Sequence, residues 1–361
     1  MISLFSTLLI SLISLLTSAP EAELVFAGDA MQHERQLKAA RQADGTYDYS
    51  PYYRAFEPYI KSADFAVINL ETTLGGTPYS GYPCFSAPDS YLRPIMDAGF
   101  DMVLLANNHM LDKRDKGLKR TVATLRNAGM PFIGAYDNAA RRSEVLPFIR
   151  DINGFKVAFL NYTYGTNGIT IQGDVVVDYI DRAKMSRDIK AAREAGAEIM
   201  TVCMHWGDEY KLLPNDTQKR LADFLFNEGV DIIIGGHPHV IQPMELRHSD
   251  RHNKNQFLVY SLGNYISAMR KTDCRGGAMV RVKLKRDTAG RAVVDSGSYR
   301  LVFVQEPDSK LRNYRLVEPE EAMKGNLAGA CREFRRNAMR IFDKYNKNVP
   351  IDTMPMSTYD K

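Results

Sequence analysis

Short apolar runs that alternate with helical patterns are the feature of this sequence that most restricts its fold. Each run has six or seven residues, and together they predict buried strands at 23–28, 64–70, 100–106, 156–162, 198–204, 230–236 and 257–263. The patterns of 114–129, 185–197 and 214–229 predict amphipathic helices. Apolar strands that alternate with helices are typical of an α/β fold whose sheets are covered on both faces.

Turn and cap residues refine this pattern. Pro214 suits the first turn of the last predicted helix, and Gly229 suits the position after its end. Asn153–Gly154 predicts a tight hairpin turn. From Gly277 onward, apolar and polar residues alternate around a glycine turn, which is typical of an antiparallel edge. Residues 318–343 predict a terminal helix, followed by a loose polar tail.

The first 19 residues differ from the rest of the 361-residue chain because none of them carries a charged side chain. Their apolar stretch of about 14 residues is short for a bilayer span and long enough for the core of a signal peptide. Thr17 and Ala19 are small residues that suit a cleavage after Ala19. We therefore expect export, with 1–19 acting either as a signal peptide or as an uncleaved N-terminal anchor.

Charge and cysteine content narrow the possible functions. The formal net charge of +4 is spread along the chain without a long basic block, so no nucleic-acid partner is expected. The four cysteines are too widely spaced for a zinc ribbon: Cys84, Cys203, Cys274 and Cys331. Cys203 lies in an apolar run and is expected in the core. Cys84 could pair with Cys274 in an exported protein, which the sequence leaves open.

Polar side chains with oxygen or nitrogen donor atoms follow six of the predicted strands. In chain order they are Asp29, Asn69, Glu71, Asn107, Asn108, His109, His205, His237, His239 and Asn264. Ligands of open α/β sheets bind outside the carboxyl ends of the strands. We therefore expect these side chains to meet at one place in the fold.

The segment GGHPHV at 235–240 is the most specific of these signals. Its two glycines are expected to let the backbone turn sharply and approach the site closely, and Pro238 to fix the bend that carries His237 and His239. Carboxylate, amide and imidazole donors together suit zinc, manganese or iron, as one ion or two. Glu71 could bridge two such ions.

Each residue also has a simpler explanation when it is taken alone. Asp29 could cap a helix, and Glu71 could stabilise a helix dipole. Asn108 could belong to an ordinary turn, and His205 could be a core histidine. If these simpler explanations all held, each group would have come to lie at a strand end for a separate reason. A shared metal site explains all of these positions at once and is therefore favoured. The remaining histidines are expected at the surface: His33, His248 and His252.

Six motifs in order then point to a known family: GDAM at 28–31, NLETTL at 69–74, ANNHMLD at 106–112, MHWGDEY at 204–210, GGHPHVIQPME at 235–245 and YSLGNYI at 260–266. Over residues 23–277 the chain resembles the CapA-type poly-γ-glutamate (capsule) synthesis proteins. That family is similar to the calcineurin-like metallophosphoesterases. The resemblance implies a four-layer αββα sandwich around a two-metal site. Beyond the matched region, residues 278–345 are expected to complete the domain with C-terminal strands and a helix.

The resemblance also implies roles for individual residues. It assigns metal binding to Asp29, Glu71, Asn108, His205, His237 and His239. Glu71 would bridge two ions, and His237 and His239 would serve one ion each. His109 would be the catalytic acid beside the substrate. Two further side chains are expected to bind substrate: Asn69 and Asn264.

One position departs from the phosphoesterase pattern. Phosphoesterases usually carry Asp-x-His in the first motif, and Met31 stands where that histidine would be. A thioether is a poor ligand for a hard or borderline ion. His33 follows two residues later, and a local helical turn could bring it near. The glycine- and proline-rich loop over 72–90 is expected to line the substrate path.

Two functions remain open at this stage. The first is a metal-dependent hydrolase or transferase of the cell envelope, acting on a phosphoester or a γ-glutamyl amide, and His109 favours it. The second is a non-catalytic accessory protein of polymer synthesis or export, and Met31 favours it. The expected partners are an envelope polymer or small-molecule substrate and membrane-bound capsule synthesis proteins. The expected location is the periplasm, the extracellular space or the outer face of the membrane.

Overall fold

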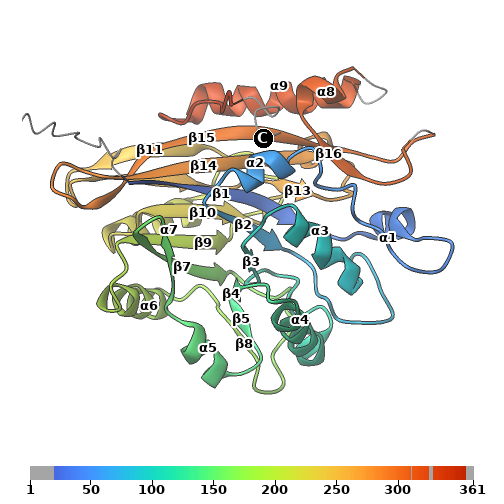
Figure 1. Ribbon diagram of the computed structural model, residues 1–361, viewed down its shortest axis with the longest axis horizontal. Helices are drawn as coiled ribbons and strands as arrows, with labels where there is room; N and C mark the ends of the chain where they lie inside the picture. The colour runs from blue at the N-terminus through green and yellow to red at the C-terminus, as the bar shows by residue number, and fades with distance from the viewer. Residues whose placement is uncertain (1–19, 310, 325–327, 355–361) are drawn as a thin grey trace, which may run out of the picture.

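Two large β-sheets lie face to face between layers of helices (Figure 1). The structure is a computed structural model, which describes residues 20–309, 311–324 and 328–354. The segment predicted as a signal peptide or anchor, 1–19, lies outside the described residues. The predicted α/β class is confirmed, and so is the arrangement of two sheets between helical layers.

The first sheet contains the N-terminal parallel strands and the C-terminal hairpin. Its order is β16 (Arg315–Val317), β15 (Ala292–Gln305), β14 (Gly276–Arg286), β1 (Glu21–Ala30), β2 (Phe65–Leu70), β3 (Met102–Leu104) and β4 (Phe132–Ile133). β1 to β4 are parallel, whereas β14 is antiparallel to both β1 and β15. The short strand β13 (Asn264–Ile266) pairs with the end of β1.

The second sheet is formed by the middle of the chain. Its order is β11 (Met244–Ser249), β12 (Lys254–Val259), β10 (Ile232–Gly236), β9 (Ile199–His205), β7 (Phe155–Thr163) and β6 (Phe148–Ile152). A separate pair joins β5 (Ala135–Tyr136) to β8 (Val176–Val177). The predicted hairpin turn is confirmed between β6 and β7, where Asn153 and Gly154 both have positive φ, of 48° and 83°.

Helices cover the outer faces of both sheets. The first sheet is covered by α2 (Glu57–Lys61), α3 (Leu92–Asp97) and α4 (Arg114–Ala128), and the second by α6 (Arg182–Glu194) and α7 (Asp216–Asn227). Four further elements are short: α1 (Glu34–Ala40), α5 (Ala139–Val145), and the 3-10 turns η1 (Asp89–Tyr91) and η2 (Thr272–Cys274). Among the described residues, no helix combines the length and the apolar character that a membrane span needs.

The strands are apolar on both faces because each face has its own core. In β1, Val25 packs toward the helices, whereas Phe26 packs toward the second sheet. From the second sheet, Phe159 and Cys203 face the same inter-sheet core, and Val202 faces α6 and α7. The predicted core position of Cys203 is confirmed. Cys84 is exposed and Cys274 is buried, and no disulfide joins them.

The start of α7 differs from the prediction. Asn215 is the N-cap, and its side chain accepts a hydrogen bond of 2.9 Å from the Gln218 amide. Pro214 therefore precedes the helix and does not belong to its first turn, because the asparagine satisfies a free amide there. Gly229 follows the helix end with φ +82°, as predicted.

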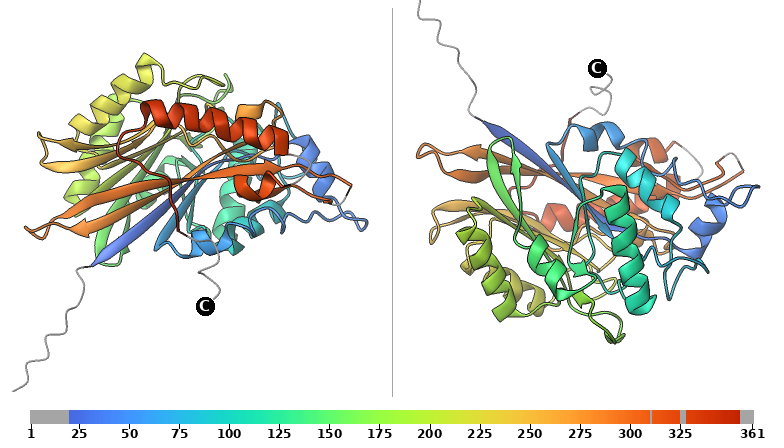
Figure 2. Two further views of the ribbon diagram at one scale, coloured as in Figure 1. Left: turned by 90° about the horizontal axis from the view of Figure 1, so that it is seen from above. Right: turned by 60° about the horizontal axis from the view of Figure 1, so that its bottom comes forward.

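The C-terminal region also differs from the prediction. The single helix expected over 318–343 is two helices, α8 (Pro319–Ala322) and the longer α9 (Ala328–Tyr345), which lies across the β14–β15 hairpin (Figure 2). The described part of the tail is held in place. The Lys347 amide donates to the Met244 carbonyl at 3.0 Å, and the Tyr299 amide donates to the Pro350 carbonyl at 2.9 Å. The tail thereby satisfies backbone groups at sheet edges.

Candidate metal centre

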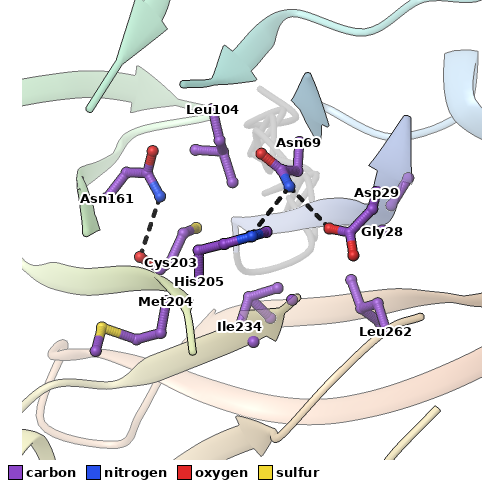
Figure 3. A pocket seen from close by; sticks show the side chains of 13 residues that line it. Gly28, Asp29, Asn69, Leu104, Asn161, Cys203, Met204, His205, Ile234 and Leu262 are labelled. Atoms are coloured by element: carbon purple, nitrogen blue, oxygen red, sulfur yellow. Dashed lines mark hydrogen bonds between the residues drawn. The ribbon is translucent and has the colours of Figure 1, made fainter. Parts of the chain in front are cut away.

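The polar side chains predicted at strand ends meet between the carboxyl ends of the two sheets. Figure 3 shows Asp29, Asn69 and His205, from β1, β2 and β9, pointing toward one another. Beside them lies a small cavity of about 20 Å³, which has room for one water molecule. Although they come from both sheets and from distant parts of the sequence, these side chains converge because parallel strands end at the same edge of a sheet.

Two groups of three ligand-type side chains share Glu71. One group is Asp29, Glu71 and His239, and the other is Glu71, His205 and His237; within each group, the donor atoms lie within 4.8 Å of one another. Asn108 adds a fourth donor to the second group, because its Oδ1 lies 2.7 Å from His205 Nε2. The six residues predicted to bind metal are thus brought together around one shared carboxylate.

The environment of Glu71 fits a divalent cation. Its side chain is fully buried, and neither carboxylate oxygen has a hydrogen-bond partner. Oε1 lies 3.6 Å from His205 Nε2 and 3.8 Å from His239 Nε2. Burial, together with the neighbouring Asp29, raises the pKa of Glu71 well above its usual range. An unpartnered buried carboxyl group is costly, and a cation between these side chains would satisfy it.

Asp29 is held as an anion at the end of β1. Burial opposes its ionisation, but hydrogen bonding with His239 and the neighbouring histidines lower its pKa to about 2. Asn69 Nδ2 donates to Oδ1 at 2.8 Å, and the His237 amide donates to Oδ2 at 3.2 Å. These donors orient the carboxylate toward the other ligands.

Burial holds His205 and His237 in the neutral form that binds metals. Burial lowers the pKa of His205 well below its usual range and that of His237 to about 4. His239 Nδ1 lies 3.1 Å from Asn264 Oδ1, so a proton on Nδ1 would be donated to this amide and Nε2 would remain free for an ion. His237 Nδ1 is buried without a hydrogen-bond partner.

The GGHPHV bend differs from the prediction in how it turns. Gly235 and Gly236 lie at the end of β10, and it is His237 and His239 that have positive φ, of 96° and 58°. The glycines serve only close approach, since a Cβ on Gly235 would lie 2.0 Å from the Tyr260 carbonyl oxygen. Positive φ at two non-glycine residues costs free energy and is typical of a functional site.

His109 forms a buried pair with Asp112 beside the metal ligands. Its Nδ1 lies 2.8 Å from Asp112 Oδ2, and only 4% of the residue is exposed. Phe85, from the loop predicted to line the substrate path, packs edge-on against the His109 ring at 4.6 Å, and its amide donates to Asp112 Oδ2 at 2.7 Å. Asp112 was not predicted, although it stands within the ANNHMLD motif.

Sequence reasoning missed three other residues at the site. Asn167 accepts a hydrogen bond of 3.1 Å from Asn108 Nδ2, which leaves Asn108 Oδ1 directed at His205. The ring of Tyr164 lies 4.5 Å from that of His237. Glu209 lies with His237 and His239 in a third group of donor atoms within 4.8 Å of one another. All three stand in loops without a recognisable ligand spacing, although Glu209 belongs to the MHWGDEY motif.

Two predictions about the other histidines are wrong. His33 is not a solvated surface residue: it is partly buried at the start of α1, its ring packs against Phe85 at 5.2 Å, and burial lowers its pKa to about 4. His252 is also partly buried, whereas His248 is exposed as predicted, on β11.

The two asparagines predicted to bind substrate are occupied within the protein. Asn69 is 7% exposed and donates to Asp29, and its Nδ2 lies 3.4 Å from His205 Nδ1. Asn264 is fully buried, contacts His239, and donates to the Cys274 carbonyl at 2.9 Å. Both amides therefore orient metal-ligand side chains. Their contact with substrate remains a prediction.

Known proteins are similar to this chain in sequence. The family model described as bacterial capsule synthesis protein PGA_cap matches residues 23–269. The capsule biosynthesis protein CapA of Bacillus anthracis is 28% identical over 289 residues, which cover 75% of this chain and 66% of that protein. The PGA biosynthesis protein CapA of Bacillus subtilis is 26% identical, over 74% of this chain and 68% of that protein.

A solved structure supports the same conclusion for the fold. The NAD nucleotidase of Haemophilus influenzae aligns with a TM-score of 0.50 and 13% identity, over 92% of this chain and 64% of that one. This similarity confirms the expected metallophosphoesterase-like fold. Because the family model covers most of the chain, the protein belongs to the PGA_cap family of bacterial capsule synthesis proteins.

Proposed function

We propose that this chain is a metal-dependent hydrolase or transferase that acts in the synthesis of a capsule polymer of the poly-γ-glutamate type. The observation that carries this proposal is Glu71, a fully buried carboxylate without hydrogen-bond partners between His205 and His239. A divalent cation bound between these side chains would give this group a partner. The family membership supports the capsule role.

The chemistry would be the hydrolysis or transfer of a phosphoester or a γ-glutamyl amide. Divalent ions held by the two groups around Glu71 would supply Lewis acidity and a water of lowered pKa. Asp112 holds His109 through Nδ1, so Nε2 is the ring nitrogen left to exchange a proton with substrate. His109 would give this proton to the leaving group, as a general acid. Phe85 packs on the ring and limits access of water.

A second function is favoured by Met31. The group that contains Asp29 and His239 has only three of the predicted ligands. A fourth is missing because Met31 offers a thioether where phosphoesterases have an imidazole. A site that holds one ion weakly would suit a non-catalytic accessory protein that binds polymer during synthesis or export. Turnover measurements separate the two functions.

The test combines metal content with turnover. The purified chain should bind manganese, zinc or iron and should cleave p-nitrophenyl phosphate, γ-glutamyl-p-nitroanilide or poly-γ-glutamate. His237→Ala should lose bound metal, whereas the matched control His248→Ala, at an exposed strand position, should retain it. Metal content equal to wild type in a folded His237→Ala variant would contradict the metal site. Full metal content without turnover of any substrate would favour the accessory function.

The proposed location is the cell envelope, with membrane-bound capsule synthesis proteins as partners. Support comes from the uncharged apolar segment 1–19. A reporter fused to residues 1–25 should leave the cytoplasm, and mass spectrometry of the mature protein would show whether cleavage follows Ala19. A version with Leu9→Arg and Leu15→Arg is the matched control and should stay inside. Retention of the unmodified fusion in the cytoplasm would refute export.

A further inference from the structure

The two groups of donors around Glu71 are unequal. Glu71, His205 and His237 are joined by Asn108, which gives four protein donors. Asp29, Glu71 and His239 form a group of only three, and the described residues give His33 no place in any such group. His33 Nδ1 instead lies 3.3 Å from the Ala268 amide, from which it can accept a hydrogen bond.

The loop after β9 is fixed directly over the HPH bend. The Trp206 amide donates to the Gly236 carbonyl at 3.1 Å, and the Tyr210 amide donates to the Pro238 carbonyl at 2.8 Å. Gly207 has φ +88°, and a Cβ there would lie 2.6 Å from the Gln218 side chain beneath the loop. Glu209 is therefore exposed but stands on a backbone with little freedom.

This loop brings the Glu209 carboxylate to the histidines. Its donor atom lies within 4.8 Å of those of His237 and His239, and His237 is 3% exposed with an unpartnered Nδ1. The adjacent acid points elsewhere, since the Asp208 carboxylate accepts a hydrogen bond of 2.8 Å from Asn215 Nδ2 at the start of α7. Asp208 therefore contacts the start of α7, whereas Glu209 lies near the histidines.

We propose that Glu209 is a metal ligand, whose carboxylate binds an ion together with His237 and His239. The proposal rests on the proposed metal centre and adds a seventh ligand to it. Carboxylates suit manganese, whereas imidazoles suit zinc and iron, so the added carboxylate should favour manganese over zinc at this position.

The test uses the protein from residue 20 to its C-terminus. Manganese binding is measured by calorimetry and by elemental analysis after dialysis. Glu209→Gln removes the charge and keeps the shape, and Asp208→Asn makes the same change one residue earlier. Loss of residues that only support metal ligands typically lowers affinity about 10–100-fold, and loss of a ligand should cost no less. We expect Glu209→Gln to lower the affinity for one manganese ion at least about tenfold, and Asp208→Asn to bind manganese as wild type does.

The outcomes separate this inference from the proposed function. If wild type binds manganese and Glu209→Gln binds it equally well, Glu209 is not a ligand, and the proposed metal centre stands. If wild type binds no divalent ion, both ideas are overturned. A Glu209→Asp variant with intermediate affinity supports a ligand role. Turnover is not needed to decide between these outcomes, because Glu209→Gln would lose affinity whether or not the protein is a catalyst.

Discussion

At the scale of single residues, the His109–Asp112 pair allows catalysis to be tested separately from metal binding. Asp112 Oδ2 lies 2.8 Å from His109 Nδ1, and neither residue belongs to a group of donors that could hold an ion among the described residues. The pair is therefore suited to deliver a proton and not to hold a metal. This division gives it a distinct signature in mutagenesis.

We expect His109→Ala to keep its metal and to lose turnover by about 10²–10⁴-fold, the usual contribution of general acid–base catalysis. Asp112→Asn should reduce turnover by a smaller factor, because the imidazole of His109 remains in place. Elemental analysis and steady-state kinetics on the same preparations check both statements. Loss of metal together with activity would identify His109 as a ligand and would refute the assigned role.

A second residue-scale prediction concerns the first motif. Met31 is 2% exposed and stands two residues after Asp29. If the backbone has the phosphoesterase geometry, Met31→His should raise metal affinity, and it should partly restore affinity in a Glu209→Gln background. His33→Ala should leave metal content unchanged, because His33 is engaged with the Ala268 amide and Phe85. A drop in metal content of His33→Ala would show that this histidine is a ligand after all.

At the scale of elements, α9 closes one side of the inter-sheet core. Ala338, Ile341 and Phe342 belong to that core, and the Phe342 ring lies 4.4 Å from the ring of Tyr299 on β15. α9 is therefore part of the packed domain and more than an appendage. Its removal would expose apolar side chains of the first sheet.

We expect Phe342→Ala to reduce the free energy of unfolding by about 3–5 kcal/mol, the usual effect of truncating a buried aromatic side chain. The control is Arg336→Ala on the exposed face of α9, which should change stability by no more than about 0.5 kcal/mol. Urea unfolding of both variants provides the measurement. Equal stability of the two variants would mean that α9 packs loosely in solution.

At the scale of the whole molecule, metal binding and folding are linked. The donors come from both sheets and meet only in the folded chain, so ions should stabilise the folded state. At an ion concentration of 100 Kd, a single site contributes about 2.7 kcal/mol. Manganese should therefore raise the melting temperature of metal-free protein by a few degrees, and chelator should reverse the change.

Glu71→Gln is the matched variant for this experiment, because it removes the shared carboxylate and keeps the size of the side chain. It should show a much smaller increase in melting temperature with manganese than wild type does. An equal increase in both proteins would mean that manganese binds elsewhere. The comparison is made by differential scanning calorimetry at one protein concentration.

Much of this protein was determined by its sequence alone. The continuous apolar runs predicted the strands because each strand must pack on both faces, as Val25 and Phe26 do in β1. The polar residues at strand ends were identified because local spacing places them after each strand. Asn153–Gly154 and Gly229 marked a turn and a helix end because their positive φ is a local property.

Only the tertiary structure decided the rest. Glu209 and Asn167 carry no ligand spacing, and their places depend on loops that contact other loops, as where the Tyr210 amide donates to the Pro238 carbonyl. The His237 amide donates to Asp29 of the other sheet, and His33 packs against Phe85 and the Ala268 amide, so the places of both histidines also depend on tertiary contacts. Local propensity cannot encode these contacts, because each joins segments that are separated along the chain and that meet only when the strands and loops pack together.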